Sequence, residues 1–221
     1  MYRLTEELSF PNPSKADRRG CIAFGGDLST ERLLLAYRNG IFPWFNEGRP
    51  IAWYTPDPRM VLFPKDLNLS KTMKQVLDRG HFQITYNNNF ESVIRNCSSI
   101  KRDGQYGTWI TEDMVKSYVE LHRLGFAHSV EAWQNGELVG GLYGISLGKC
   151  FFGESMFAKV SNASKAAFIT FVMKLEALGF WLIDCQMYTE HLASLGADLI
   201  PRAVFLDYLK KNKKEEEKLM L

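Results

Sequence analysis

The stretch from residue 140 to residue 186 constrains the fold most, because its hydrophobic period changes along its length. It reads as a strand, a tight turn, a second strand, a helix from about residue 162 to 178, and a last strand, WLIDCQ. Just upstream, AHSVEAW and ELVGGLYGI flank an Asn135-Gly136 pair, a strong signal for a type I′ hairpin turn. The order therefore predicts a three-stranded antiparallel meander followed by a helix and a further strand.

Three polar side chains interrupt these apolar strands. Glu154 lies in CFFGESMF, and Asp184 and Gln186 lie in WLIDCQ. Alternation along a strand predicts that Asp184 and Gln186 share one face and that Cys185 points to the other. A structural pair bonded to backbone or water is the commoner explanation for two such residues on one strand. A second carboxylate on a neighbouring strand favours a reaction site.

Phenylalanines surround this polar group in the sequence, at positions 151, 152, 168 and 171. Together they predict an apolar pocket with an acidic, hydrogen-bonding edge. Such a pocket suits a hydrophobic side chain and a cationic partner.

The chain divides by composition at about residue 62. Residues 1–62 are rich in proline and glycine and contain one clear helix that Ser29 can cap, which predicts a small N-terminal domain. Residues 63–221 form the second domain, with a charged C-terminal tail to which we assign no role. The expected fold class is α+β, with a mixed, largely antiparallel sheet in the second domain.

Several aromatic and basic residues have two interpretations. Trp44 and Trp109 lie in loops and can either fill the core or offer a ring face to a base. Tyr118 has core spacing on its helix. Lys71 and Lys74 follow the helix cap at Ser70, where they form either a solvated face or a contact surface for a phosphate backbone.

Composition excludes several classes of protein. The net charge is only +2 over 221 residues, and the four cysteines are scattered without a CxxC pair. This pattern predicts a reduced, cytoplasmic protein without structural zinc or disulfides. The four histidines show no metal spacing, and the sequence has neither a signal-peptide core nor an apolar run of membrane length. We therefore expect no metal and no membrane association.

The order of meander, helix and strand also occurs in the acetyltransferase-like (GNAT) fold, a likeness of topology alone. In that family a glycine-containing loop at the helix start holds the phosphates of acetyl-CoA. The loop here, AKVSNASKAA, has no glycine, so the sequence disfavours coenzyme A and we expect no cofactor. An acetyltransferase of small amines stays open as an alternative on the residues alone.

Ten blocks over about residues 9–209 resemble the leucyl/phenylalanyl-tRNA–protein transferases. The blocks are GGDLS…RLLLAYRNGIFPWF, PDPR, GTWI, AHSVEAW, LVGGLYG, FGESMF, NASK, LIDCQ, SLGA and IPR. The resemblance implies transfer of leucine or phenylalanine, and methionine less well, from aminoacyl-tRNA to a protein with N-terminal arginine or lysine. The product enters N-terminal-residue-dependent degradation. It further implies a protein that needs neither metal nor ATP, with a small N-terminal domain and a GNAT-like C-terminal domain. We also expect a monomer. A non-catalytic protein that binds the tRNA acceptor end through the tryptophans and lysines stays open as a second alternative.

The resemblance also implies roles for single residues. Asp184 and Gln186 match the reacting pair and Glu154 a third polar group; Asp184 could accept a proton, polarise the amide of Gln186 or attract the cationic N-terminus. Lys71 and Lys74 match tRNA-backbone contacts. The residues that match the adenosine site and cleft are Tyr37, Trp44, Trp109 and Tyr118, and those that match the amino-acid pocket are Leu142, Phe151, Phe171, Leu175 and Ile183. Tyr54, where some relatives have tryptophan, and the bulky Phe152 depart from the pattern.

Overall fold

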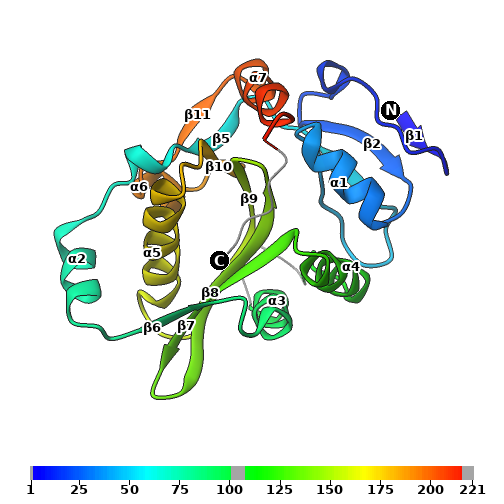
Figure 1. The fold of residues 1–221 in the computed structure, drawn as a ribbon. Coiled ribbons are helices and arrows are strands. Elements are labelled where there is room, and N and C mark those ends of the chain that lie inside the picture. The colour runs from blue at the N-terminus through cyan, green and yellow to red at the C-terminus, as the bar shows by residue number, and fades with distance from the viewer. Residues whose placement is uncertain (1, 101–107, 216–221) are drawn as a thin grey trace.

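A computed structural model of the protein describes residues 2–100 and 108–215. Two sheets organise it (Figure 1). The first has the order β1-β2-β4-β3 and consists of β1 (Tyr2–Leu4), β2 (Cys21–Gly25), β3 (Phe42–Pro43) and β4 (Ala52–Tyr54). Helix α1 (Thr30–Arg38) belongs to the same part of the chain, and the side chain of Ser29 caps it as predicted by accepting from the backbone N–H of Arg32.

The second sheet has seven strands in the order β11-β5-β10-β9-β8-β7-β6. Its strands are β5 (Arg59–Leu62), β6 (Gln83–Tyr86), β7 (Ala127–Gln134), β8 (Glu137–Leu147), β9 (Cys150–Ala158), β10 (Leu182–Gln186) and β11 (Asp198–Ile200). The predicted meander is the antiparallel run β7-β8-β9, and β10 pairs with β9 in parallel. The sheet is therefore mixed and largely antiparallel, and the predicted fold class, α+β with an acetyltransferase-like order of elements, is confirmed.

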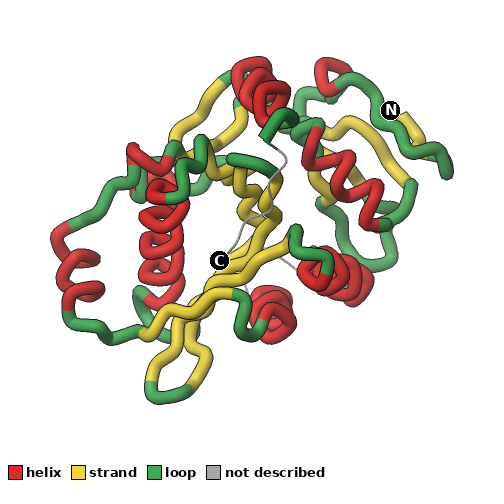
Figure 2. The backbone as a smooth tube through the Cα atoms, in the orientation of Figure 1, coloured by secondary structure: helices red, strands yellow, loops and turns green. Residues whose placement is uncertain are grey.

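Helices cover both faces of the second sheet (Figure 2). Helix α5 (Ala163–Ala177) packs on one face, and α3 (Phe90–Ser99) and α4 (Glu112–Arg123) pack on the other. The remaining helices are α2 (Lys71–Asp78), α6 (Glu190–Ser194), α7 (Arg202–Asn212) and two short 3-10 helices, η1 (Pro13–Lys15) and η2 (Pro64–Asp66). Because successive strand residues face opposite sides, the core has two apolar halves, one on each side of the sheet.

Glycines explain two local features of the second sheet, a tight turn and the close packing of a helix on a strand. Asn135 and Gly136 have φ of 52° and 80°, the positive values that a type I′ turn requires. Gly140 lies under the start of α5, where a Cβ atom would come within 2.6 Å of the Ala163 Cβ. The absence of a side chain at Gly140 lets α5 lie directly on β8.

The chain passes from the first sheet to the second a few residues before the expected division between residues 62 and 63. Strand β5 begins at Arg59 and pairs with β10, so it belongs to the second sheet. Helix α7 then packs back on the first part of the chain, and a Cβ atom on Gly40 would come within 2.9 Å of Phe205 and Leu206. The second sheet therefore includes the last residues of the segment assigned to the N-terminal domain.

Residues 216–221 of the charged tail lie outside the described residues. Among residues 2–100 and 108–215, no helix combines the length and the apolar character that crossing a membrane requires.

Candidate active site

A cavity of about 390 Å³ opens between the first sheet and the part of the second sheet that carries Glu154 on β9 and Gln186 on β10. Its walls are mostly apolar and come from both parts of the chain: Phe42, Pro43 and Trp44 from the first, and Trp109, Leu142, Phe151, Met156, Phe168 and Ile183 from the second. Glu154, Cys185, Gln186 and His191 supply polar atoms to the same wall. This combination of an apolar cavity with a few convergent polar groups is typical of a small-ligand site.

Glu154 is the centre of the polar group. Gln186 Nε2 donates to its Oε1 over 2.8 Å, Tyr37 donates to Oε1 over 2.7 Å, and Tyr118 donates to Oε2 over 3.2 Å. The two tyrosine hydroxyls also contact each other. Burial raises the pKa of Glu154 to about 7; the three hydrogen bonds act in the opposite direction, and the charge of Asp184 adds to the rise. Glu154 therefore changes charge near neutral pH.

The contact with Glu154 fixes the orientation of the Gln186 amide. A carboxylate only accepts hydrogen bonds, so the NH₂ end of Gln186 must face it. The carbonyl Oε1 of Gln186 is then the end of the amide that can accept a hydrogen bond from a ligand. Gln186 lies in the cavity wall, where such a ligand would be.

The predicted alternation of β10 is wrong at its last residues. Asp184 pairs with Val61 and Gln186 with Met60, so Cys185 is one extra residue opposite β5, and Gln186 has a φ of 65°. This bulge turns Cys185 and Gln186 into the cavity wall together. Asp184 is fully buried outside that wall.

The partner of Asp184 is Arg59, the first residue of β5. Arg59 Nε lies 2.8 Å from Asp184 Oδ1, and Nη2 lies 2.6 Å from Oδ2. The backbone N–H of Gln186 also donates to Asp184 Oδ1, over 2.9 Å. Asp184 is therefore a structural acceptor for the bulge, and its charge is balanced by a buried cation.

Comparison with known proteins identifies the family. The model of the leucyl/phenylalanyl-tRNA protein transferase N-terminal domain matches residues 26–57, and the leucyl/phenylalanyl-tRNA protein transferase model matches residues 61–210. The leucyl/phenylalanyl-tRNA–protein transferase of Flavobacterium johnsoniae is 57% identical over 95% of this chain and 99% of that protein. This chain belongs to the leucyl/phenylalanyl-tRNA–protein transferase family. The Myxococcus xanthus transferase is 53% identical over 97% of this chain and 93% of that protein.

Among solved structures, a GCN5-related N-acetyltransferase from Kribbella flavida aligns with a TM-score of 0.36 and 8% identity, covering 76% of this chain and 59% of that chain.

In this member of the transferase family, the residues expected in the amino-acid pocket fall into two groups. Leu142, Phe151 and Ile183 line the cavity. Phe171 and Leu175 are fully buried on α5 and lie behind that wall, with the ring of Phe171 edge-on to Phe151 at a centroid distance of 4.7 Å. The second group supports the pocket from behind.

The residues expected at the adenosine site divide in the same way. Trp44 and Trp109 line the cavity. Tyr37 and Tyr118 have 1% and 0% of their surface exposed and hold Glu154 from the side away from the cavity. Their hydroxyls therefore position a polar group of this transferase instead of forming its cavity wall.

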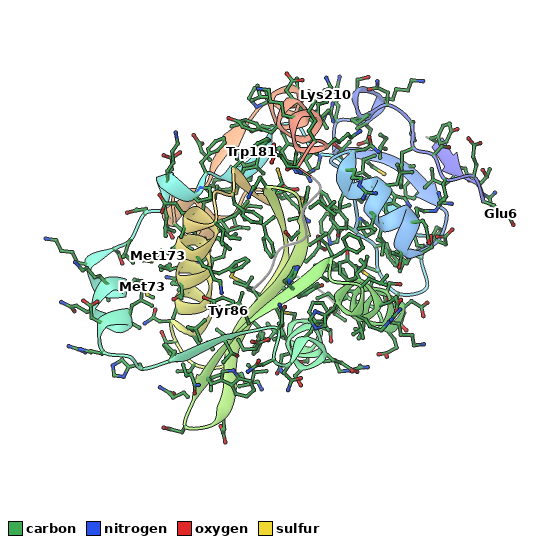
Figure 3. The ribbon with its side chains drawn as sticks, in the orientation of Figure 1. Glu6, Met73, Tyr86, Met173, Trp181 and Lys210 are labelled. Carbon is green, nitrogen blue, oxygen red and sulfur yellow. The ribbon has the colours of Figure 1, made fainter. Side chains whose placement is uncertain are left out.

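The lysines expected to contact tRNA are exposed on α2. Met73 attaches this helix to the core beside α5 (Figure 3). Lys71 and Lys74 precede and follow Met73, and both side chains face solvent.

Sequence reasoning missed Arg59, although the PDPR block contains it. The available signal was a pair of opposite charges in two apolar segments: an arginine before the run MVLF and Asp184 in WLIDCQ. Two such charges are expected to neutralise each other when both are buried. No group of three or more His, Cys, Asp or Glu side chains in the described part of this transferase is arranged to hold a metal ion.

Proposed function

We propose that this chain transfers leucine or phenylalanine, and methionine less well, from aminoacyl-tRNA to a protein with N-terminal arginine or lysine, which marks that protein for degradation. The observation that carries the proposal is the apolar cavity with the Gln186 amide fixed in its wall by Glu154. The family name, which specifies a tRNA-dependent protein transferase, supports the same activity.

The reaction is aminolysis of an ester. The amine nitrogen of the acceptor protein attacks the carbonyl carbon of the aminoacyl ester, a C–N bond forms, and the bond to the ribose oxygen of tRNA breaks. The proton lost by the amine leaves with the ribose hydroxyl. The ester is already activated, so no ATP is consumed, and the protein supplies orientation and hydrogen bonds.

In this scheme Oε1 of Gln186 accepts a hydrogen bond from the attacking amine. This hydrogen bond directs the lone pair of the amine nitrogen toward the carbonyl carbon of the ester. Glu154 keeps the amide in that orientation, and Tyr37 and Tyr118 keep Glu154 in place. Because the charge of Asp184 is paired with Arg59 and buried, we assign it neither proton transfer nor attraction of the cationic N-terminus. Its role is to accept from the Gln186 backbone.

The substrate groups are assigned to different parts of the cavity. We propose that Trp44 and Trp109 stack on the terminal adenosine, since aromatic rings in a wall offer a face to a base. Leu142, Phe151 and Ile183 take the leucine or phenylalanine side chain, with Phe171 and Leu175 behind them. We further propose that the protein acts as a monomer in the cytoplasm, where its four cysteines stay reduced.

The apolar wall predicts discrimination among aminoacyl groups. Leucine should be transferred about 10- to 200-fold faster than valine, since each missing methylene loses burial in such a pocket. Glutamate should not be transferred detectably, because its carboxylate would lose hydration without gaining a partner. Single-turnover assays with one tRNA charged with each amino acid would measure this order, and equal rates for leucine and valine would contradict the pocket assignment.

The exposed lysines predict the salt dependence of tRNA binding. Replacing Lys71 and Lys74 with alanine should weaken binding of charged tRNA and reduce the slope of log K against log salt by about 1 to 2, because each phosphate contact releases counterions. Lys210→Ala with Lys211→Ala on α7 makes the same change in net charge and should leave the slope unchanged. A wild-type slope in the α2 variant would place the tRNA elsewhere.

Glu154 predicts a pH dependence of turnover. Its pKa is raised to about 7, so the ionised form that accepts from Gln186 is lost as the pH falls through 7. The ratio of kcat in the wild type to kcat in Glu154→Gln should therefore rise with pH across that range, while ionisation of the acceptor amine affects both proteins alike. The pH profiles of both proteins with one Arg-starting peptide give this ratio, and a constant ratio would exclude Glu154 titration.

A peptide assay separates the proposal from its two alternatives. With leucyl-tRNA, the enzyme should raise the mass of an Arg-starting peptide by one leucine residue, whereas a protein that only binds tRNA leaves the mass unchanged. An acetyltransferase should instead be stabilised thermally by acetyl-CoA. Stabilisation by acetyl-CoA together with an unchanged peptide mass would overturn the proposed function.

A further inference from the structure

Arg59 does not line the cavity, and it reaches the candidate site only through other side chains. Its side chain is 1% exposed and makes a two-pronged ion pair with the fully buried Asp184. Within the described residues, its third guanidinium nitrogen, Nη1, has no hydrogen-bond partner. Asp184 is thus the one described carboxylate in an ion pair with Arg59, and two buried charges persist in a core only when each neutralises the other.

Two aromatic rings fix the guanidinium group. Arg59 Cζ lies 4.8 Å from the ring centroid of Phe42 and 4.7 Å from that of Phe205. Phe42 belongs to the first sheet and to the cavity wall, and Phe205 belongs to α7. The guanidinium is therefore held by contacts from three separate parts of the chain, which defines where the Asp184 carboxylate must lie.

The carboxylate in turn holds a strained backbone. Asp184 Oδ1 accepts from both Arg59 Nε and the backbone N–H of Gln186. Gln186 has a φ of 65°, a left-handed conformation that residues other than glycine adopt rarely and keep only where their surroundings enforce it. Without this acceptor, the bulge would lose the contact that enforces it, and the Gln186 side chain would lose its direction toward Glu154.

We propose that Arg59 is a positioning residue for aminoacyl transfer: through Asp184 it holds Gln186 in the bulged conformation that places the amide in the cavity wall. This inference rests on the proposed function for its kinetic consequence only. Arg59 lies outside the cavity wall, so it has no contact with substrate and acts through the backbone of Gln186.

Arg59→Lys is the first test, because lysine keeps the charge but cannot bridge both carboxylate oxygens. We expect kcat to fall about 10²-fold, the size of effect that small misplacements of reacting groups produce, while KM for leucyl-tRNA and for an Arg-starting peptide stays within about threefold. Arg32→Lys is the matched control. Arg32 is also fully buried and bonded to an aspartate and backbone carbonyls, and it should keep wild-type kcat per folded molecule.

The double variant Arg59→Met with Asp184→Leu keeps the inference testable if Arg59→Lys does not fold. It removes both charges and the acceptor for the Gln186 N–H, so the protein should fold and still show the low kcat. Near wild-type kcat in either folded variant would overturn the inference, because the ion pair would then serve stability alone.

Backbone hydrogen exchange at Gln186, measured by NMR, gives a readout independent of activity. Exchange should accelerate in Arg59→Lys at Gln186 while staying slow at Ile183 in the same strand. If the wild type fails to transfer leucine, the proposed function is wrong, and faster exchange at Gln186 would still support the positioning role. Unchanged exchange at Gln186 would contradict it.

Discussion

Replacing Gln186 with alanine is expected to lower kcat for leucine transfer about 10²- to 10³-fold, the cost of removing one positioned hydrogen-bonding group from a reacting centre. KM for charged tRNA should stay within about threefold, because the residues assigned to adenosine and to the leucine side chain are unchanged. The side chain of Gln186 contacts Glu154 through Nε2 and leaves Oε1 for the amine. Steady-state kinetics with leucyl-tRNA and an Arg-starting peptide would measure both constants.

The control for this variant is Gln83→Ala on β6, where the glutamine is exposed at the edge of the sheet. It should have wild-type kinetics. Cys185→Ala does not serve as a control, because the bulge places Cys185 in the cavity wall. A folded Gln186→Ala protein with wild-type kcat would remove Gln186 from the mechanism.

Asp184→Leu alone should destabilise the protein by about 3–5 kcal/mol, since it leaves the buried Arg59 without its counter-charge. For a domain of this size the loss corresponds to a fall in Tm of about 6–20 °C. Urea unfolding followed by circular dichroism would measure the free energy difference.

Adding Arg59→Met to Asp184→Leu should recover most of the lost stability, because apolar side chains can replace a buried ion pair at little cost. A single Asp184→Leu variant as stable as the wild type would show that Arg59 does not depend on Asp184. A double variant less stable than either single one would show that the pair contributes more than mutual neutralisation.

Much of the fold follows from local sequence signals. The helix caps at Ser29 and Ser70 and the Asn135-Gly136 turn depend on residues a few positions apart, and all of them occur as predicted. The meander and its following helix also depend on periodicity within one stretch. Such signals are readable because the atoms that make each contact are close in sequence.

The site could be predicted only in part, because its decisive contacts are distant in sequence. The bulge at Cys185 is defined by the register of β10 against β5, and nothing within LIDCQ indicates the extra residue. The partnership of Arg59 with Asp184 depends on the same pairing. Tyr37 has core spacing in its helix, and only the packing of α1 against α4 and β9 brings its hydroxyl to Glu154.

The resemblance to the transferases identified the important residues more reliably than it located them. It selected Asp184 and Gln186 together, although one is a buried support and the other lies in the cavity wall. It likewise grouped Leu142 with Leu175, which lie in the wall and behind it. A residue can support a site without touching what binds there.

The most direct test of the account is a single-turnover reaction of the wild-type enzyme, pre-bound to leucyl-tRNA, with two peptides that differ only at the N-terminus. One begins with a free arginine, and the other begins with the same arginine acetylated on its α-amine. Mass spectrometry should find one leucine added at the N-terminus of the free peptide and none on the blocked one. Leucine on neither peptide, or equally on both, would contradict transfer to an N-terminal amine aimed by Gln186.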